Sequence, residues 1–243
     1  MGWHEVIRRY RRTSLGPFWT TASLALFICT IGFMYSAVWQ MDIAKYLPYL
    51  ASGFIVWIMM SGTISESCAA FISAEALLKQ VRFPYTGLVC AVVLRNIIIT
   101  GHHIVIYVIV WLMFPQPVGW VTLLVLPGLG LWVVNGVWIG IVLGIACARF
   151  RDIQQLVSSI LQVAMFVTPI LYPVDALLRL RGSGEFLVYL NPLHHFVDVI
   201  RAPLLGHAPD MLSYEVTAGA AVFGTFFCLW LLDRTRHKIV FWV

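Results

Sequence analysis

Charged side chains are scarce in this chain. Asp, Glu, Lys and Arg make up 11% of its 243 residues, whereas a soluble domain usually carries about 25%. Hydrophobic residues make up 60% of the sequence. A protein this apolar needs an apolar solvent, and the hydrocarbon of a lipid bilayer is such a solvent. The composition therefore predicts an integral membrane protein.

Motifs for several kinds of chemistry are also missing. None of the three lysines follows a glycine, so the chain has no G-x-x-x-x-G-K-S/T loop for ATP. Neither H-E-x-x-H nor G-x-S-x-G occurs, and the five cysteines show no C-x-x-C spacing. Two histidine pairs, His102-His103 and His194-His195, are adjacent, and neighbours on a helix point about 100° apart. We therefore expect no catalytic residue, no metal site and no cofactor in this chain.

Charge-free runs locate the membrane-spanning helices, each of which needs roughly 20 apolar residues. Asn96–Ala148 contains no charged residue. One helix of that length would measure about 80 Å, so Pro115 and Pro117 must divide it. We expect six spans, at 18–41, 48–71, 87–113, 120–148, 153–173 and 215–233.

Three further segments do not fit simple spans. Residues 3–14 combine apolar residues at helical spacing with four arginines, which is typical of an amphipathic helix in the membrane interface. Residues 72–85 alternate apolar and charged positions and end at Pro84, which predicts a short amphipathic helix. Residues 174–213 hold apolar runs too short to cross, which predicts a re-entrant outer hairpin. The expected fold is a single all-α membrane domain.

The basic residues predict the orientation. The net charge is +5, and eleven Lys and Arg residues fall on one side of the six spans while four fall on the other. Cytoplasmic loops collect Lys and Arg. The richer side, with both chain termini, is therefore expected to be cytoplasmic. The positive charge is explained by membrane orientation, and we expect no nucleic-acid partner.

Four motifs, in order along the chain, are similar to those of one protein family. Arg9–Trp19, Ala148–Ile153, Thr168–Pro173 and Asn191–Leu193 resemble segments of the permease subunits of ABC-type exporters of polysaccharides and O-antigens. The resemblance covers nearly the whole chain. It implies a bacterial inner-membrane permease that pairs with a second copy of itself and with two ATPase subunits, which bind the ATP and Mg²⁺. It also implies a lipid-linked polysaccharide as substrate, with the O-antigen branch favoured over capsule or teichoic-type polymers.

The resemblance assigns roles to particular residues. The helix at 72–85 would be a coupling helix that docks into the ATPase through Glu75, Leu77, Leu78, Lys79, Arg82 and Phe83. The alternative for its apolar face is lipid headgroups. A lipid-linked substrate of this family carries a pyrophosphate, which the forked donors of Arg8, Arg9, Arg11 and Arg12 would suit. Orientation and anionic-lipid binding explain the same four arginines.

Aromatic residues at the predicted outer ends of the spans have two interpretations. Trp39, Tyr172 and Tyr189 fit a channel or exit lined by rings that stack on sugars. They fit equally the aromatic belt at a membrane interface.

Two other classes of function remain open at this point. A membrane enzyme of polyprenyl-linked glycan metabolism would need paired carboxylates or a metal, and only the isolated Asp152 and Glu75 are candidates. An ion channel or coupled carrier would need charged residues inside the spans, and only Glu66 and Arg95 lie there.

Overall fold

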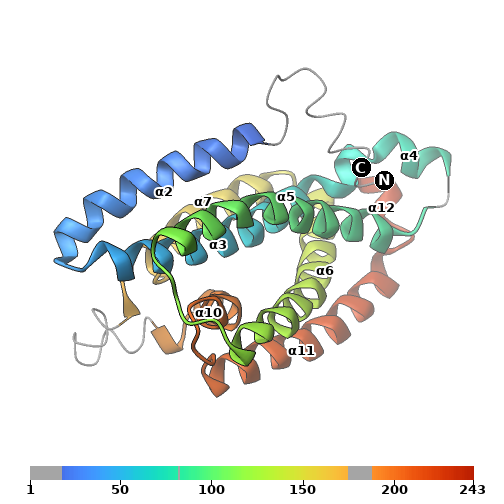
Figure 1. Cartoon of the computed structure of the whole chain (residues 1–243). Helices are drawn as coiled ribbons and strands as arrows, with labels where there is room; N and C mark the ends of the chain where they lie inside the picture. Colours follow the sequence, from blue (N-terminus) through green and yellow to red (C-terminus); the bar gives the residue numbers. More distant parts are fainter. Residues whose placement is uncertain (1–17, 82, 175–187) are drawn as a thin grey trace.

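Every element of the described structure is helical. The computed structural model describes residues 18–81, 83–174 and 188–243, and these ranges contain no strand. The long helices are α2 (Phe18–Trp39), α3 (Ile43–Ser73), α5 (Tyr85–Met113), α6 (Val125–Arg149) and α11 (Met211–Thr235). The shorter elements are α4 (Glu75–Gln80), η1 (Trp120–Leu124), α7 (Asp152–Val167), α10 (Pro192–Leu204) and α12 (Ile239–Trp242). Their arrangement is shown in Figure 1.

Five helices in the described part are long and apolar enough to cross a membrane: α2, α3, α5, η1 together with α6, and α11. The prediction of an all-helical membrane protein is therefore confirmed. Helix α7 has 16 residues, about 24 Å, against a hydrocarbon thickness of about 30 Å. The fifth expected span, at 153–173, thus stays a prediction. The expected interface helix at 3–14 lies outside the described residues.

Helix α3 is the central element of the bundle. It contacts α2, α5, α6, α7 and α10, while α11 packs against α6 and α10 (Figure 1). Three clusters of buried apolar side chains follow α3 along its length, around Tyr46 to Trp57, Val56 to Ile64, and Ala70 to Phe71.

A tight turn joins α2 to α3, and α2 ends at Trp39 rather than at 41. Gln40 adopts a φ of 51°, and the amide of Met41 donates to the carbonyl of Ser36 at 3.0 Å. This is the Schellman pattern that closes many helices. Asp42 then accepts from the amide of Ala44 at 3.0 Å. This N-cap starts α3 at Ile43, five residues before the start expected from the sequence.

One end of the bundle extends beyond α2. The Phe18 ring, at the start of α2, lies 6.0 Å from the ring of His102 in α5. From Tyr85 to His102 the rise of α5 is about 25 Å. We call the end that carries α4, α12 and the start of α5 the inner end, and the opposite end the outer end. At the inner end α4 and α12 lie together, past the start of α2 (Figure 1).

Helix α10 packs among α3, α6 and α11 toward the outer end. It starts where Asn191 accepts from the amide of Leu193 at 3.0 Å, with Pro192 in the first turn. With 13 residues it measures about 20 Å, too short to cross. The expected hairpin at 174–213 stays a prediction, because residues 175–187 lie outside the described ranges.

A glycine allows α10 to approach α6 closely, which gives a test of the packing. A Cβ atom on Gly128 would lie 2.6 Å from the carbonyl oxygen of Val199, whereas one on Gly130 would meet nothing within 4 Å. We expect Gly128→Ala to lower the free energy of unfolding by about 2 kcal/mol, since a backbone atom must shift. The control, Gly130→Ala, should leave it unchanged or raise it slightly. SDS titration in mixed micelles measures both, and equal losses would contradict the close approach.

Candidate functional site

The short helix α4 carries an exposed ion pair at the inner end. Lys79 Nζ lies 2.6 Å from Glu75 Oε1, one turn away, and both side chains are about half exposed. The hydrogen bond from Lys79, together with its charge, holds the pKa of Glu75 below its usual value. The pair lies on the side of α4 that faces away from the bundle, with the exposed residues Ala76 and Gln80 beside it.

The expected coupling helix at 72–85 is shorter than the sequence suggests. Helix α3 continues to Ser73, and α4 occupies only Glu75–Gln80. Val81 is extended at φ −134° and ψ 142°, and Pro84 disfavours helical geometry at the residue before it.

Leu78 faces the interior of this chain. It is 6% exposed and belongs to the buried cluster that includes Phe71, Val89 and Ile239. Most of its side chain is therefore covered by this chain, and its contact with an ATPase stays a prediction. Leu77 and Phe83 are partly buried. Arg82 lies outside the described residues.

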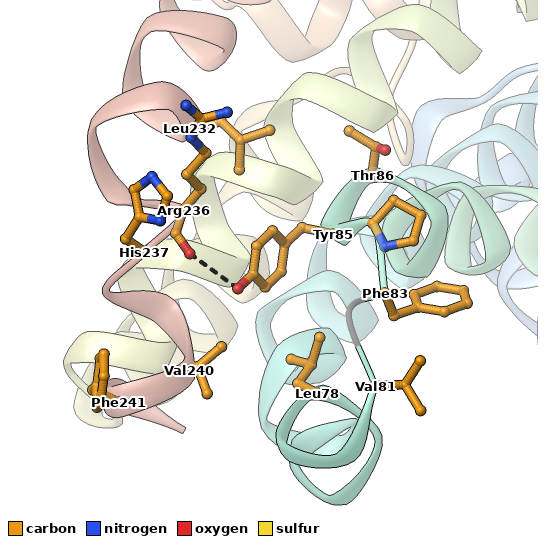
Figure 2. Close-up of a pocket in the computed structure, with 11 residues that line it drawn as sticks. Leu78, Val81, Phe83, Tyr85, Thr86, Leu232, Arg236, His237, Val240 and Phe241 are labelled. Atoms are coloured by element: carbon orange, nitrogen blue, oxygen red, sulfur yellow. Dashed lines mark hydrogen bonds between the residues drawn. The ribbon is translucent and has the colours of Figure 1, made fainter.

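A groove of about 800 Å³ opens between α4 and the end of α11. We call it the inner groove. One wall consists of Leu78, Val81, Phe83 and the start of α5, and the other of Leu232, Arg236, His237, Val240 and Phe241 (Figure 2). The hydroxyl of Tyr85 donates to the carbonyl of Arg236 at 3.0 Å and joins the two walls. Segments about 150 residues apart in the sequence thus form one surface.

The two charged residues inside the spans form a pair. Nε and Nη2 of Arg95 lie 3.0 and 2.7 Å from Oε2 of Glu66. Nδ2 of Asn96 donates to the same oxygen at 2.8 Å. A carboxylate that accepts three such bonds links α3 to α5, which favours a structural role over an ion pathway.

A second groove, of about 420 Å³, runs between α3 and α7. We call it the membrane groove. Its lining consists of Trp57, Ser61, Ser65, Ser158, Leu161, Gln162, Met165 and Phe166. Hydroxyl and amide groups, aromatic rings and aliphatic carbons are all present in this lining, and none of its residues is ionisable. The lining between α3 and α7 thus offers both hydrogen-bonding groups and apolar contacts to a ligand.

Helix α7 has two different faces, and none of its residues is buried within this chain. Gln154, Ser158 and Gln162 form a polar row at intervals of four residues, toward the membrane groove. An apolar row lies elsewhere on the helix, with Leu156, Ile160 and Val163 all more than half exposed.

Of the three aromatic residues expected at the exit, the structure describes the side chains of Tyr172 and Tyr189. The hydroxyl of Tyr172 donates to the carbonyls of Phe166 and Val167 at 2.8 and 2.9 Å, which caps the end of α7. The ring of Tyr189 is 45% exposed. Nothing is described of the Trp39 side chain, and Arg8, Arg9, Arg11 and Arg12 lie outside the described ranges.

The structure also shows a cluster at the outer end whose contacts the sequence did not indicate. Arg201 is 3% exposed, and its Nη1 donates to the carbonyl of Pro169 at 2.7 Å. Its guanidinium lies 4.4 Å from the centre of the Tyr49 ring. Tyr49 also donates to the Pro169 carbonyl, at 2.8 Å. The exit from α7 is thus held by side chains of α3 and α10, and no local sequence signal marks these partners.

Comparison with known proteins agrees with this architecture. Residues 1–205 match the ABC-2 type transporter family. An O-antigen export system permease protein RfbA from Myxococcus xanthus is 24% identical over 219 residues, which cover 90% of this chain and 84% of the relative. A protein of the same name from Klebsiella pneumoniae is 27% identical over 192 residues, which cover 76% and 71%. A second from Klebsiella pneumoniae is 25% identical over 214 residues, covering 85% and 78%.

Permeases of this family pair with separate ATPase subunits, so the protein is a transporter subunit and the enzyme alternative is set aside. The family match extends over most of the chain, from before α2 to the end of α10. The chain belongs to the ABC-2 type transporter family, as its membrane permease.

Proposed function

We propose that this chain is the transmembrane subunit of an ATP-driven exporter that moves an O-antigen-like, lipid-linked polysaccharide out of the cytoplasm across the bacterial inner membrane. Two copies pair, and two ATPase subunits bind the ATP and Mg²⁺. Both termini and the inner end are cytoplasmic. The relatives named O-antigen export permeases support the substrate class, and the excess of basic residues supports the orientation.

The membrane groove is the observation that carries the polysaccharide assignment. The hydroxyls of Ser61 and Ser158 donate to the carbonyls of Trp57 and Gln154, at 2.7 and 3.0 Å. Their oxygen lone pairs remain able to accept hydrogen bonds from sugar hydroxyls. The exposed amide of Gln162 can both donate and accept. The rings of Trp57 and Phe166, in the same lining, offer apolar faces to the C–H side of a sugar ring.

The lining of the membrane groove also favours an uncharged glycan. Its eight residues include no cation. An anionic polymer that leaves water needs cationic partners, because an unpaired charge is very costly in an apolar setting. Capsule and teichoic-type polymers that carry a negative charge on most repeats are therefore less suited to this path.

The apolar row of α7 supports the pairing of two copies. Leu156, Ile160 and Val163 recur at intervals of four and three residues, which places them on one side of a helix. Packing of this row against a second copy would cover the exposed apolar surface of α7. The arginines at 8, 9, 11 and 12 would then receive the pyrophosphate at the cytoplasmic surface. Trp39, Tyr172 and Tyr189 would lie near the exit.

Substitution of one side chain tests whether the polysaccharide passes along the membrane groove. Gln162→Leu removes the exposed amide from the groove and keeps a similar volume, so we expect translocation of a lipid-linked neutral O-polysaccharide to fall about fivefold, as for the loss of roughly one hydrogen bond. The measurement uses proteoliposomes that contain the permease with its ATPase. The control, Gln155→Leu, removes an exposed glutamine of the same helix that does not line the groove, and should change little.

The same vesicles test the charge of the substrate. A polyanionic lipid-linked polymer should be moved much more slowly than the neutral one. Equal rates for the two polymers would contradict the assignment of an uncharged glycan, and equal losses in Gln162→Leu and Gln155→Leu would contradict the groove as the path.

A further inference from the structure

The segment 239–243 is anchored to the bundle at the inner end. Ile239 is fully buried and Val243 nearly so, both in the cluster that contains Phe71 and Leu78. The Trp242 ring lies 5.3 Å from the guanidinium carbon of Arg149. With Tyr85 bonded to Arg236, these contacts hold α12 in a defined place opposite α4.

The anchored segment nevertheless leaves apolar side chains uncovered. Phe241 is 86% exposed and Val81, on the opposite wall of the inner groove, is 56% exposed. Val240 and Leu78 lie between them (Figure 2). The side chain of Arg236, which is 56% exposed, lines the same groove, and a charged group of this kind lies at low cost only outside the hydrocarbon layer. A contiguous exposed apolar surface in that position is typical of a protein interface.

The charge around the inner groove indicates the chemistry of the partner. The described residues at the inner end include six basic side chains, Lys79, Arg149, Arg151, Arg234, Arg236 and Lys238, against three acidic ones, Glu75, Asp152 and Asp233. The pairs Glu75–Lys79 and Asp233–Arg236 satisfy two of the carboxylates. The remaining excess of positive charge is complementary to an acidic surface.

We propose that the inner groove is half of the ATPase docking site, so that the ATPase subunit is held by α12 as well as by α4. The groove takes an apolar side chain of the ATPase, and the basic rim pairs with carboxylates beside that side chain. The exposed Lys79 precedes Val81 by two residues. This inference rests on the proposed function and adds the segment 232–241 to the partner surface.

Charge substitution in the groove tests the inference. The permease is co-expressed with its ATPase, and the ATPase retained on the purified permease is measured. We expect Val240→Asp and Val81→Asp each to reduce retention at least fivefold. The control, Phe150→Asp, alters an exposed apolar residue at the same end that does not line the groove, and should retain the ATPase. Full retention by Val240→Asp, or equal loss in Phe150→Asp, would overturn the inference.

A further variant separates this inference from the proposed function. Lys79→Glu reverses an exposed charge on α4, outside the groove. If Lys79→Glu releases the ATPase while Val240→Asp retains it, docking through α4 stands and the role of α12 is wrong. If both variants retain the ATPase, docking at the inner end is itself wrong.

Photo-crosslinking identifies the occupant without relying on damage to the fold. The photoreactive residue p-benzoylphenylalanine is placed at position 241, where the side chain is 86% exposed. In membranes that contain the whole complex, we expect a crosslink to the ATPase subunit that disappears with Lys79→Glu. Crosslinks only to lipid or to a second copy of this chain would overturn the proposal.

Discussion

Replacing Glu66 with alanine is expected to lower the free energy of unfolding by about 3 kcal/mol. The change removes the carboxylate oxygen that accepts from Arg95 and from Asn96. The Arg95 guanidinium, 18% exposed, would lose this carboxylate in a setting of low dielectric constant. Breaking a buried pair in this way costs roughly 3–5 kcal/mol, and partial exposure places this pair at the lower end. SDS titration in mixed micelles measures the difference.

The exposed pair on α4 is the matched control. Glu75 and Lys79 are as close as Glu66 and Arg95, at 2.6 against 2.7 Å, but their side chains are about half exposed. Glu75→Ala should produce no measurable change, because solvent screens such a pair. The double variant Glu66→Leu with Arg95→Met should recover at least half of the loss, since neither charge remains. Equal effects of Glu66→Ala and Glu75→Ala would contradict the dependence on burial.

Replacing Tyr46 with alanine is expected to have an even larger effect, about 4 kcal/mol. The side chain is fully buried, and its hydroxyl donates to the carbonyl of Leu171 at 2.5 Å. Truncation of a buried aromatic ring leaves a cavity and removes many apolar contacts. Because Leu171 follows α7, the exit segment should also loosen, which protease sensitivity of that segment would report.

Two variants separate the contribution of the Tyr46 hydroxyl to stability from that of its ring. Tyr46→Phe keeps the ring and leaves the Leu171 carbonyl without this donor, which should destabilise the protein by about 1.5 kcal/mol. Tyr189→Ala alters a tyrosine that is 45% exposed, and should change stability by less than about 0.5 kcal/mol. If Tyr46→Phe were as damaging as Tyr46→Ala, the hydrogen bond rather than packing would dominate.

Much of the local structure followed from simple rules. Scarce charge and long apolar runs predict membrane helices, and the structure confirms an all-helical chain with five long apolar helices. Pro115 and Pro117 lie between α5 and η1, as expected of residues that cannot continue a helix. The start of α3 was harder to predict from the sequence. The charged Asp42 and Lys45 interrupt the apolar pattern, although Asp42 acts as the N-cap of the helix.

What the sequence by itself determined is which segments prefer lipid to water. It could not determine which side of each helix meets another helix, because lipid tails are as apolar as a protein core and both faces of a span carry similar residues. Leu78 was therefore expected to face a partner although most of its side chain packs inward, and Arg201, which falls within the expected outer hairpin at 174–213, is buried. Only the tertiary structure brought α12 against α4 and α7 against α3. The two grooves lie at those contacts, between residues that are distant in the chain and share no sequence pattern.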